Sequence, residues 1–182
     1  EGRLKKDTLV VTVMSNIGLK KRMTELGINV AETKVGDRYV LEEMLKEGYS
    51  IGGEQSGHVI FLDKNTTGDG MLTAIQVLDV MKSTGRRMSA LANDIPIYPQ
   101  VLVNVIVDNE IKHQAMEDQD LLQRIREVEG KLGSSGCVLV RASGTEPIIR
   151  VMLEGQNTDE ISDCAIYIVK VLEQKYKGKI RV

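Results

Sequence analysis

The first half of the chain alternates short apolar runs with segments of helical periodicity, and this alternation restricts the possible folds most strongly. Residues 8–14 (TLVVTVM) have the β-rich, continuously apolar character of a buried strand with parallel neighbours. Leu19, Met23 and Leu26 then recur at helical spacing, and residues 28–33 form a second β-rich run. Strand, helix and strand in this order predict a βαβ-type domain with a mixed sheet.

Caps and an apolar stripe predict the remaining long helices of this half. Ser15 or Asn16 caps the first helix, and residues 39–46 form a second one. Asp69 caps a long helix over residues 71–83. Four apolar side chains recur along one side of that helix, namely Met71, Ile75, Leu78 and Met81. We expect this stripe to face the hydrophobic core.

A proline-containing segment separates the two halves of the chain. Residues 93–99 (NDIPIYP) hold Pro96 and Pro99, two of the three prolines. Because proline cannot donate a backbone hydrogen bond and disfavours helix in the residue before it, regular structure is interrupted here. We therefore predict two domains, over residues 1–93 and 94–182.

The second half follows a β-α-β-β-α order. Its strands are expected over residues 101–107, 137–141 and 148–153, and its first helix over residues 121–132. Asn157 opens the last helix as an N-cap. This order predicts a small antiparallel sheet with helices on one face. The predicted fold class is therefore α/β followed by α+β.

Composition argues against several classes of function. The formal net charge is −2, so the chain lacks the basic surface of a nucleic-acid-binding protein, and no cationic face favours a membrane. Its apolar runs are far shorter than the ~18 residues of a transmembrane helix. Cys137 and Cys164 lie in apolar contexts without Cys-x-x-Cys spacing. We interpret them as buried, reduced thiols of a cytoplasmic protein.

One segment resembles a metal-binding loop. Residues 63–68 (DKNTTG) are similar to the start of a calcium loop, but Ala74 stands where such a loop needs a bidentate glutamate. We therefore predict that this chain holds no metal ion.

The segment 141–147 (RASGTEP) gathers anion-binding groups at the tip of a predicted strand-loop-strand. A guanidinium can hold two phosphate oxygens at once, and hydroxyls donate hydrogen bonds. A glycine amide can approach an anion closely because no Cβ intervenes. Glu146 argues mildly against a purely anionic ligand. Ser-Gly-Thr is also ordinary turn chemistry, so a polar hairpin turn with a solvated Arg141 is the alternative interpretation.

Two glycine-containing segments of the first half are candidate ligand loops. Residues 50–58 (SIGGEQSGH) combine three glycines, which favour close approach of a ligand, with the hydrogen-bonding side chains of residues 54–58. A carboxylate beside a hydroxyl can bind the vicinal hydroxyls of a sugar. Residues 34–38 (KVGDR) form a strand-to-helix turn, a common position for ligands in α/β proteins. A tight β-turn with a structural histidine, and Asp37 as a simple N-cap, are the alternatives.

Residues 53–58 (GEQSGH), followed by residues 141–147, resemble two signature motifs of the α-D-phosphohexomutase superfamily. The likeness covers essentially the whole chain. It implies a four-domain enzyme whose domains supply, in order, a phosphoserine, an Asp-rich Mg²⁺ loop, sugar recognition and phosphate binding. The chain resembles the third and fourth domains only, because neither a serine loop nor an Asp-rich loop occurs in it. We expect a fragment of a longer protein that is inactive by itself.

The resemblance also implies roles for individual residues. His58 would lie near the transferring phosphoryl group as a partner in proton transfer, and the nucleophilic serine would lie outside the chain. Met14 stands where relatives carry a lysine. The implied sugar-binding residues are Glu54, Ser56, Gly36 and Asp37. The implied phosphate-binding residues are Arg141, Ser143, Gly144, Thr145 and Arg150.

The implied reaction interconverts glucosamine 6-phosphate and glucosamine 1-phosphate through glucosamine 1,6-bisphosphate, a step in the synthesis of cell-wall amino sugars. Mg²⁺ would be held by residues outside this chain. The implied partners are a hexosamine phosphate and the missing N-terminal domains, whereas nucleic acid and membrane are not expected and a homodimer stays open. The alternatives are a sibling mutase for mannose or glucose phosphates and a non-catalytic sugar-phosphate-binding module.

Overall fold

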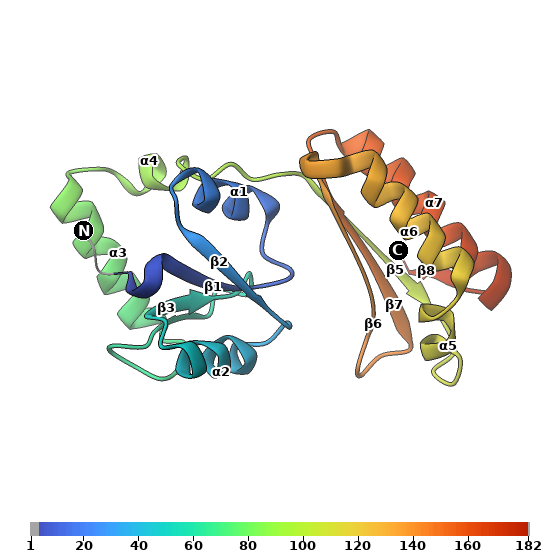
Figure 1. Cartoon of the computed structure of the whole chain (residues 1–182), viewed down its shortest axis with the longest axis horizontal. Helices are drawn as coiled ribbons and strands as arrows, with labels where there is room; N and C mark the ends of the chain where they lie inside the picture. The colour runs from blue at the N-terminus through green and yellow to red at the C-terminus, as the bar shows by residue number, and fades with distance from the viewer. Residues whose placement is uncertain (1–3, 182) are drawn as a thin grey trace. The chain divides into compact units, whose positions relative to one another are not determined.

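The computed structural model describes residues 4–181, which fold into two compact units (Figure 1). The first unit extends to Ile97, and the second begins at Tyr98. Each unit has its own four-stranded sheet and its own hydrophobic core. No helix within residues 4–181 is long and apolar enough to cross a membrane.

The sheet of the first unit is mixed, as predicted. Its strands are β1 (Thr8–Thr12), β2 (Asn29–Thr33), β3 (Ile51–Gly53) and β4 (Val59–Phe61). The spatial order is β2-β1-β3-β4, with β1 parallel to β2 and β3, and β4 antiparallel to β3. The sequence pattern does not predict β3, because a three-residue segment with two glycines has little strand propensity.

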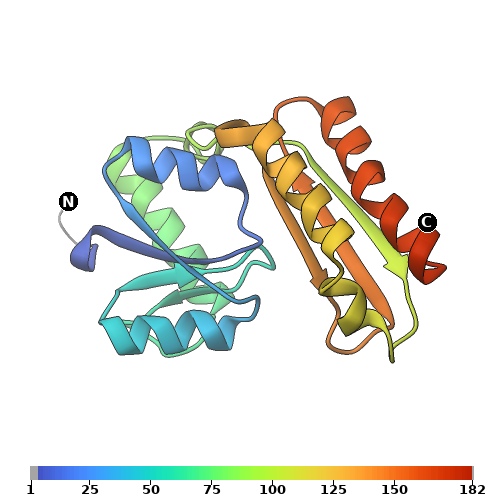
Figure 2. The ribbon, with the colours of Figure 1, turned by 45° about the vertical axis from the view of Figure 1, so that its right-hand side comes forward.

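The helices of the first unit lie on both sides of this sheet. They are the 3-10 helix η1 (Lys5–Asp7) and the α-helices α1 (Ile17–Glu25), α2 (Asp37–Glu47), α3 (Gly70–Thr84) and α4 (Met88–Ala92). Both views show α1 and α2 on opposite sides of the sheet (Figures 1 and 2). Asn16 caps α1 by accepting from the Gly18 N–H, and Asp69 caps α3 by accepting from the Leu72 N–H. The cap predicted at Asp69 is therefore confirmed.

The core of the first unit is small and lies between α2 and the sheet. Val10, Val40, Met44 and Ile60 form its buried cluster. At Gly52, in β3, a Cβ atom would lie 2.7 Å from both the Val40 Cγ1 and the Met44 Sδ atoms. Such an approach is closer than van der Waals contact allows, so glycine is what lets α2 pack this tightly on β3.

The apolar stripe of α3 does not face the core, and the prediction that it would do so is wrong. The exposed fractions of Met71, Ile75 and Leu78 are 80%, 60% and 60%, and only Met81 is half-buried. α3 contacts β4 with a different side of the helix. Helical spacing indicates that a helix has an apolar face, but burial also needs a second surface, and nothing within residues 4–181 covers this one.

The sheet of the second unit is antiparallel throughout, as predicted. Its strands are β5 (Gln100–Ile106), β6 (Cys137–Ala142), β7 (Ile148–Glu154) and β8 (Lys179–Arg181), in the spatial order β6-β7-β5-β8. The edge strand β8 has three residues, and the sequence pattern does not predict it. Its pairing brings Arg181 opposite Asn104, although the two residues are far apart in the chain.

The helices of the second unit cover one face of its sheet. They are α5 (Lys112–Met116), α6 (Gln119–Leu132) and α7 (Thr158–Tyr176), with the 3-10 helix η2 (Gly133–Ser135) after α6. Figure 2 shows α6 and α7 side by side on this face. Asn157 caps α7 by accepting from the Asp159 and Glu160 N–H groups, which confirms the predicted cap. The short helix α5 has too few residues to show a periodic pattern, and the sequence does not predict it.

The core of the second unit lies between these helices and the sheet. Helix α7 carries four apolar residues at helical spacing, and all four are fully buried, namely Ile161, Ala165, Ile168 and Leu172. From the sheet, alternate residues such as Val105 and Val151 enter the same core. The residues between them in each strand therefore project from the opposite face of the sheet. Cys164 is buried, whereas Cys137 is only half-buried, so the prediction of two buried thiols holds for one of them.

Candidate functional site

The loop between β6 and β7 is a tight turn with two exposed residues at its tip. The Ser143 N–H donates to the Ile148 carbonyl at 2.9 Å, which closes the turn, and the Ser143 hydroxyl accepts from the Glu146 N–H at 3.2 Å. Ser143 is buried, while Gly144 and Thr145 are exposed. A Cβ atom on Gly144 would meet nothing within 4 Å, so the fold itself places no steric demand for glycine there.

Arginines occupy adjacent positions across the sheet next to this turn. Arg141 of β6 lies directly opposite Arg150 of β7, Arg150 lies opposite Asn104 of β5, and Asn104 lies opposite Arg181 of β8. Directly paired residues project from the same face, here the face away from α6 and α7. Like charges directly opposite one another are destabilising unless a counterion lies between them. We call these four residues the arginine row.

Two electrostatic features make the arginine row suited to an anion. Burial of the Arg141 guanidinium and the nearby charge of Arg150 both lower the pKa of Arg141. The Arg150 Nε–H is a buried donor for which residues 4–181 supply no acceptor. A buried donor without an acceptor is costly. An oxyanion beside the row would relieve both effects.

Glu146 balances part of this positive charge. Its carboxylate accepts hydrogen bonds from Arg150 at 2.9 Å and from Arg181 at 3.0 Å. The bonds from Arg181 and Arg150 hold the pKa of Glu146 below its usual value. Two guanidinium groups, those of Arg150 and Arg181, thus share one carboxylate. Arg181 was not among the predicted site residues, because only the strand pairing of β8 brings it here.

Lys112 lies beneath the same turn and was likewise not predicted. Its side chain is buried, and its Nζ atom donates to the carbonyl oxygens of Ser143 at 2.7 Å and Glu146 at 3.3 Å. No motif in the sequence marks this lysine, since it lies in the unpredicted helix α5. The five predicted phosphate-binding residues, from Arg141 to Arg150, all lie within or directly beside this turn and row.

The turn between β3 and β4 gathers three of the predicted sugar-binding or catalytic side chains. Ser56 Oγ donates to Glu54 Oε1 at 2.6 Å and lies 2.8 Å from His58 Nδ1, which itself lies 3.2 Å from Glu54 Oε1. Gly57 has a φ of 96°, a conformation that favours glycine in this turn. The side chain of Glu54 is 11% exposed and that of His58 is 55% exposed. We call these three side chains the Glu54 cluster.

The second predicted loop reaches the Glu54 cluster through its backbone. The Gly36 N–H donates to Glu54 Oε2 at 3.2 Å, and Gly36 occupies the N-cap of α2 with a φ of 130°. Only glycine adopts this backbone conformation readily. Asp37 is the first residue of α2 rather than its N-cap, so that alternative interpretation is wrong. Its exposed carboxylate accepts from the Arg38 N–H and does not join the cluster.

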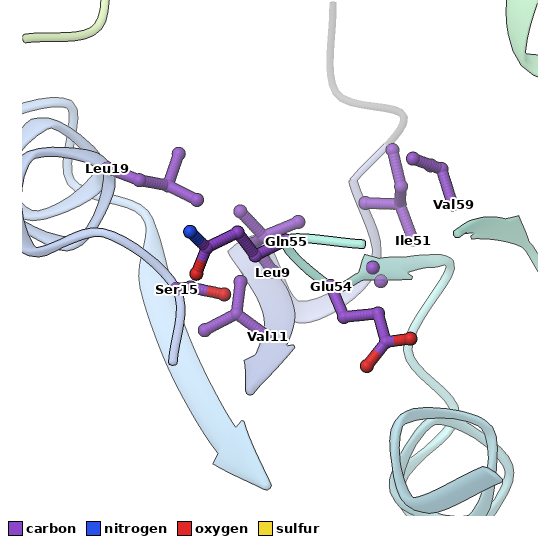
Figure 3. Close-up of a pocket in the computed structure, with 10 residues that line it drawn as sticks. Leu9, Val11, Ser15, Leu19, Ile51, Glu54, Gln55 and Val59 are labelled. Carbon is purple, nitrogen blue, oxygen red and sulfur yellow. The ribbon is translucent and has the colours of Figure 1, made fainter. Parts of the chain in front are cut away.

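A cavity of about 250 Å³ opens beside the Glu54 cluster (Figure 3). Apolar side chains of β1, β3 and α1 form most of its wall, among them Val11, Leu19 and Ile51. Figure 3 shows the Glu54 carboxylate directed toward α2, away from this wall. The hydrogen-bonding groups therefore lie at the edge of the cavity. Within residues 4–181 no group of three or more His, Cys, Asp or Glu side chains is arranged to hold a metal ion.

Comparison with known families assigns both units. Residues 1–98 match the description "Phosphoglucomutase/phosphomannomutase, alpha/beta/alpha domain III", and residues 102–171 match "Phosphoglucomutase/phosphomannomutase, C-terminal domain". The chain belongs to the phosphoglucomutase/phosphomannomutase family. The predicted superfamily resemblance and fold class are thereby confirmed.

Individual relatives agree with this assignment. The chain is 56% identical over 175 residues to the phosphoglucosamine mutase of Alkaliphilus oremlandii, and 55% identical over 174 residues to that of Clostridium perfringens. Each alignment covers 96% of this chain and 39% of the relative, so the chain spans less than half the length of these proteins. Among solved structures, the N-acetylphosphoglucosamine mutase of Aspergillus fumigatus shares the fold, with a TM-score of 0.77 and 19% identity. That alignment covers 93% of this chain and 38% of the fungal one.

Proposed function

We propose that the chain is the sugar- and phosphate-binding part of a phosphoglucosamine mutase. The complete enzyme interconverts glucosamine 6-phosphate and glucosamine 1-phosphate through glucosamine 1,6-bisphosphate. The observation that carries this proposal is the arginine row with its unsatisfied Arg150 Nε–H, beside a turn that exposes a glycine amide and a hydroxyl. The names of the bacterial relatives at 53–56% identity support glucosamine as the sugar.

In this proposal the second unit holds the phosphate that does not react. Arg141 and Arg150 neutralise the dianion, and the Gly144 amide and the Thr145 hydroxyl donate hydrogen bonds to it. The Ser143 oxygen already accepts from the Glu146 N–H, so Ser143 maintains the turn as well as offering its hydroxyl proton. During the reaction either phosphate of the bisphosphate must bind at this site. The site must therefore recognise the phosphate through charge and hydrogen bonds, without contacts specific to one end of the sugar.

The first unit would hold the sugar ring. The Glu54 carboxylate can accept from two adjacent equatorial hydroxyls, and Ser56 can turn its hydroxyl from Glu54 to the sugar. The Gly36 N–H holds Glu54 Oε2 in place. Asp37, on the same loop, is the second proposed sugar-binding carboxylate. A carboxylate that accepts from neighbouring hydroxyls suits both orientations of the ring, since the hydroxyl pattern is similar from either end.

His58 is the proposed proton-transfer residue of this chain. Ser56 Oγ donates to Glu54, so the same oxygen accepts from His58 and the imidazole proton lies on Nδ1. Nε2 is then the nitrogen that can exchange a proton with the reacting oxygen. The His58 side chain is 55% exposed, so a ligand can approach the ring.

The remaining catalytic groups are proposed to lie in the preceding domains of the complete protein. These would supply the phosphoserine and the ligands of Mg²⁺, which stabilises charge on the transferring phosphoryl group when bound. A solved relative from Aspergillus fumigatus was crystallised with GlcNAc-6P and magnesium. The proposal places the enzyme in the cytoplasm, in agreement with Cys137 and Cys164 being thiols rather than a disulfide, and leaves a homodimer open.

Binding by this chain alone is expected to be weak. Charge-assisted hydrogen bonds contribute about 1.5–3 kcal/mol each, so three or four of them supply roughly 5–12 kcal/mol. Association costs on the order of 4–15 kcal/mol, which leaves a net near zero. We expect glucosamine 6-phosphate to bind this chain with a millimolar or weaker Kd by titration calorimetry, and micromolar binding would contradict this account.

Kinetics of the full-length enzyme test the proposal. Arg141→Gln should raise KM for glucosamine 6-phosphate about tenfold or more, because each 1.4 kcal/mol of lost binding is a factor of ten. Arg126→Gln, at an exposed arginine of α6 outside the site, is the matched control and should leave KM unchanged. An unaltered KM in Arg141→Gln would refute the phosphate role. A preference of the wild type for mannose or glucose phosphates would refute the sugar assignment.

A further inference from the structure

Lys112 is an unusual lysine because its charged end is inside the protein. The residue is 6% exposed, and it opens the short helix α5, whose Ala115 is fully buried in the core of the second unit. Lysine is rarely this buried unless its ammonium group has partners. Here the partners of Nζ are two backbone carbonyls, those of Ser143 and Glu146.

These partners leave the charge of Lys112 without a counterion. Backbone carbonyls are neutral, and within residues 4–181 no carboxylate oxygen lies within 4 Å of Lys112 Nζ. The Glu146 carboxylate is instead bonded to Arg150 and Arg181. An uncompensated buried cation therefore lies directly beneath a turn whose exposed tip consists of Gly144 and Thr145.

The geometry of the peptide group connects Lys112 to the opposite side of this turn. The carbonyl of Ser143 and the N–H of Gly144 belong to one peptide unit. No peptide bond within residues 4–181 is cis, so these two groups point in opposite directions. Because the carbonyl is directed at Lys112 Nζ at 2.7 Å, the Gly144 N–H is directed away from the lysine. A hydrogen bond to the carbonyl also polarises the peptide group and strengthens its N–H as a donor.

We propose that Lys112 is a positioning residue for phosphate binding, which orients and polarises the Gly144 amide and adds a buried positive charge behind it. The inference rests on the proposed phosphate role of this turn. Lys112 does not touch the anion. It acts through one peptide group, and it fixes the turn a second time through the Glu146 carbonyl. A phosphate dianion on the outer side of the turn would then be the counterion that the lysine lacks.

The test is a titration of this 182-residue chain with inorganic phosphate, followed through the backbone amide signals by NMR at constant ionic strength. In the wild type, the Gly144 amide proton should show the largest downfield shift among residues 141–150, since its N–H donates to the anion. Lys112→Met keeps the aliphatic stem and removes the charge. It should weaken phosphate binding about tenfold, which lowers the initial slope of the Gly144 shift against phosphate concentration by the same factor. Lys170→Met, at an exposed lysine of α7, is the matched control and should leave both values unchanged.

The outcomes separate the two proposals. If phosphate shifts no signal of residues 141–150 in the wild type, the proposed phosphate site fails and this inference fails with it. If wild-type residues shift but the Gly144 amide does not, or if Lys112→Met binds phosphate as the wild type does, only the role of Lys112 is refuted. Should Lys112→Met fail to fold, Lys112→Gln takes its place. Lys112→Gln, a neutral donor, should then keep the orientation of the turn but lose affinity.

Discussion

The two units are similar in length, but their hydrophobic cores differ in extent. In the first unit four residues form the buried cluster, whereas sixteen do so among the described residues of the second. Helices α3 and α7 illustrate the difference, because both carry an apolar stripe at helical spacing. α7 packs against β5, β7 and α6, so its stripe is buried, while α3 contacts the sheet chiefly at β4 and exposes its stripe. An amphipathic sequence predicts a helix, but the surroundings decide whether its apolar face is buried.

The largest expected effect contrasts these two helices directly. Ile168→Ala in α7 should lower the free energy of unfolding of the second unit by about 2–5 kcal/mol, because the side chain is fully buried and its removal leaves a cavity. Ile75→Ala in α3 removes the same atoms from a side chain that is 60% exposed, so it should change stability by less than about 0.5 kcal/mol. Urea unfolding followed by circular dichroism measures both. Equal losses would show that the α3 stripe is buried in solution.

A smaller effect is expected where the small core of the first unit is most tightly packed. Gly52→Ala places a methyl group 2.7 Å from Val40 Cγ1 and Met44 Sδ, so it should cost about 1–3 kcal/mol through overpacking. Gly70→Ala is the matched control, because its Cβ would meet nothing within 4 Å. Amide hydrogen exchange of β1 and β3 reports the change. A Gly52→Ala variant as stable as Gly70→Ala would mean that α2 and the sheet separate easily.

The smallest expected effect is a loss of stability of the second unit at low pH. Burial opposes ionisation of Asp118, but hydrogen bonds from Lys175, Tyr176 and the backbone N–H groups of Leu121 and Asp120 outweigh it and lower the pKa from 3.8 to about 2. The stabilisation is therefore present above pH 3.8 and is lost as pH falls toward 2. Asp118→Asn keeps an N-cap oxygen but removes the charge that Lys175 and Tyr176 stabilise. It should therefore cost about 1 kcal/mol at neutral pH and flatten the dependence between pH 4 and 2.

Denaturant midpoints at several pH values measure this effect. Glu173→Gln, at an exposed position of α7, is a suitable control with the same change in net charge, and it should keep the wild-type slope. If Asp118→Asn retains the full pH dependence between pH 4 and 2, other carboxylates stabilise the second unit against acid.

Much of the fold could be predicted from local patterns. The apolar runs around Val10 and Val103 form strands, and the caps at Asp69 and Asn157 begin helices, since these signals depend on neighbours within a few residues. The short elements β3, β8 and α5 escaped prediction because three to five residues carry no measurable period. They are held by the sheets and cores around them rather than by their own propensity.

The residues of the candidate site also fall into two groups, those that local patterns predict and those that only the tertiary structure reveals. The motif residues from Glu54 to His58 and from Arg141 to Thr145 were predictable, because each set lies on one turn and its chemistry can be read from consecutive residues. Arg181 and Lys112 could not be found this way, because each reaches the site through contacts with residues more than 30 positions away. Glu146 also gained a different interpretation, since strand pairing makes its carboxylate a partner of two arginines.

The amino-acid sequence by itself determined most of the strands and helices, where the chain turns, and which turns carry the groups proposed to bind sugars and phosphate. Only the tertiary structure decided which apolar faces are buried, which arginines stand side by side, and which lysine lies beneath the turn at Gly144. The physical reason is the sequence separation over which each kind of interaction acts. Propensity, capping and turn chemistry act between close neighbours in the chain, whereas burial and charge compensation depend on surfaces that the folded chain brings together.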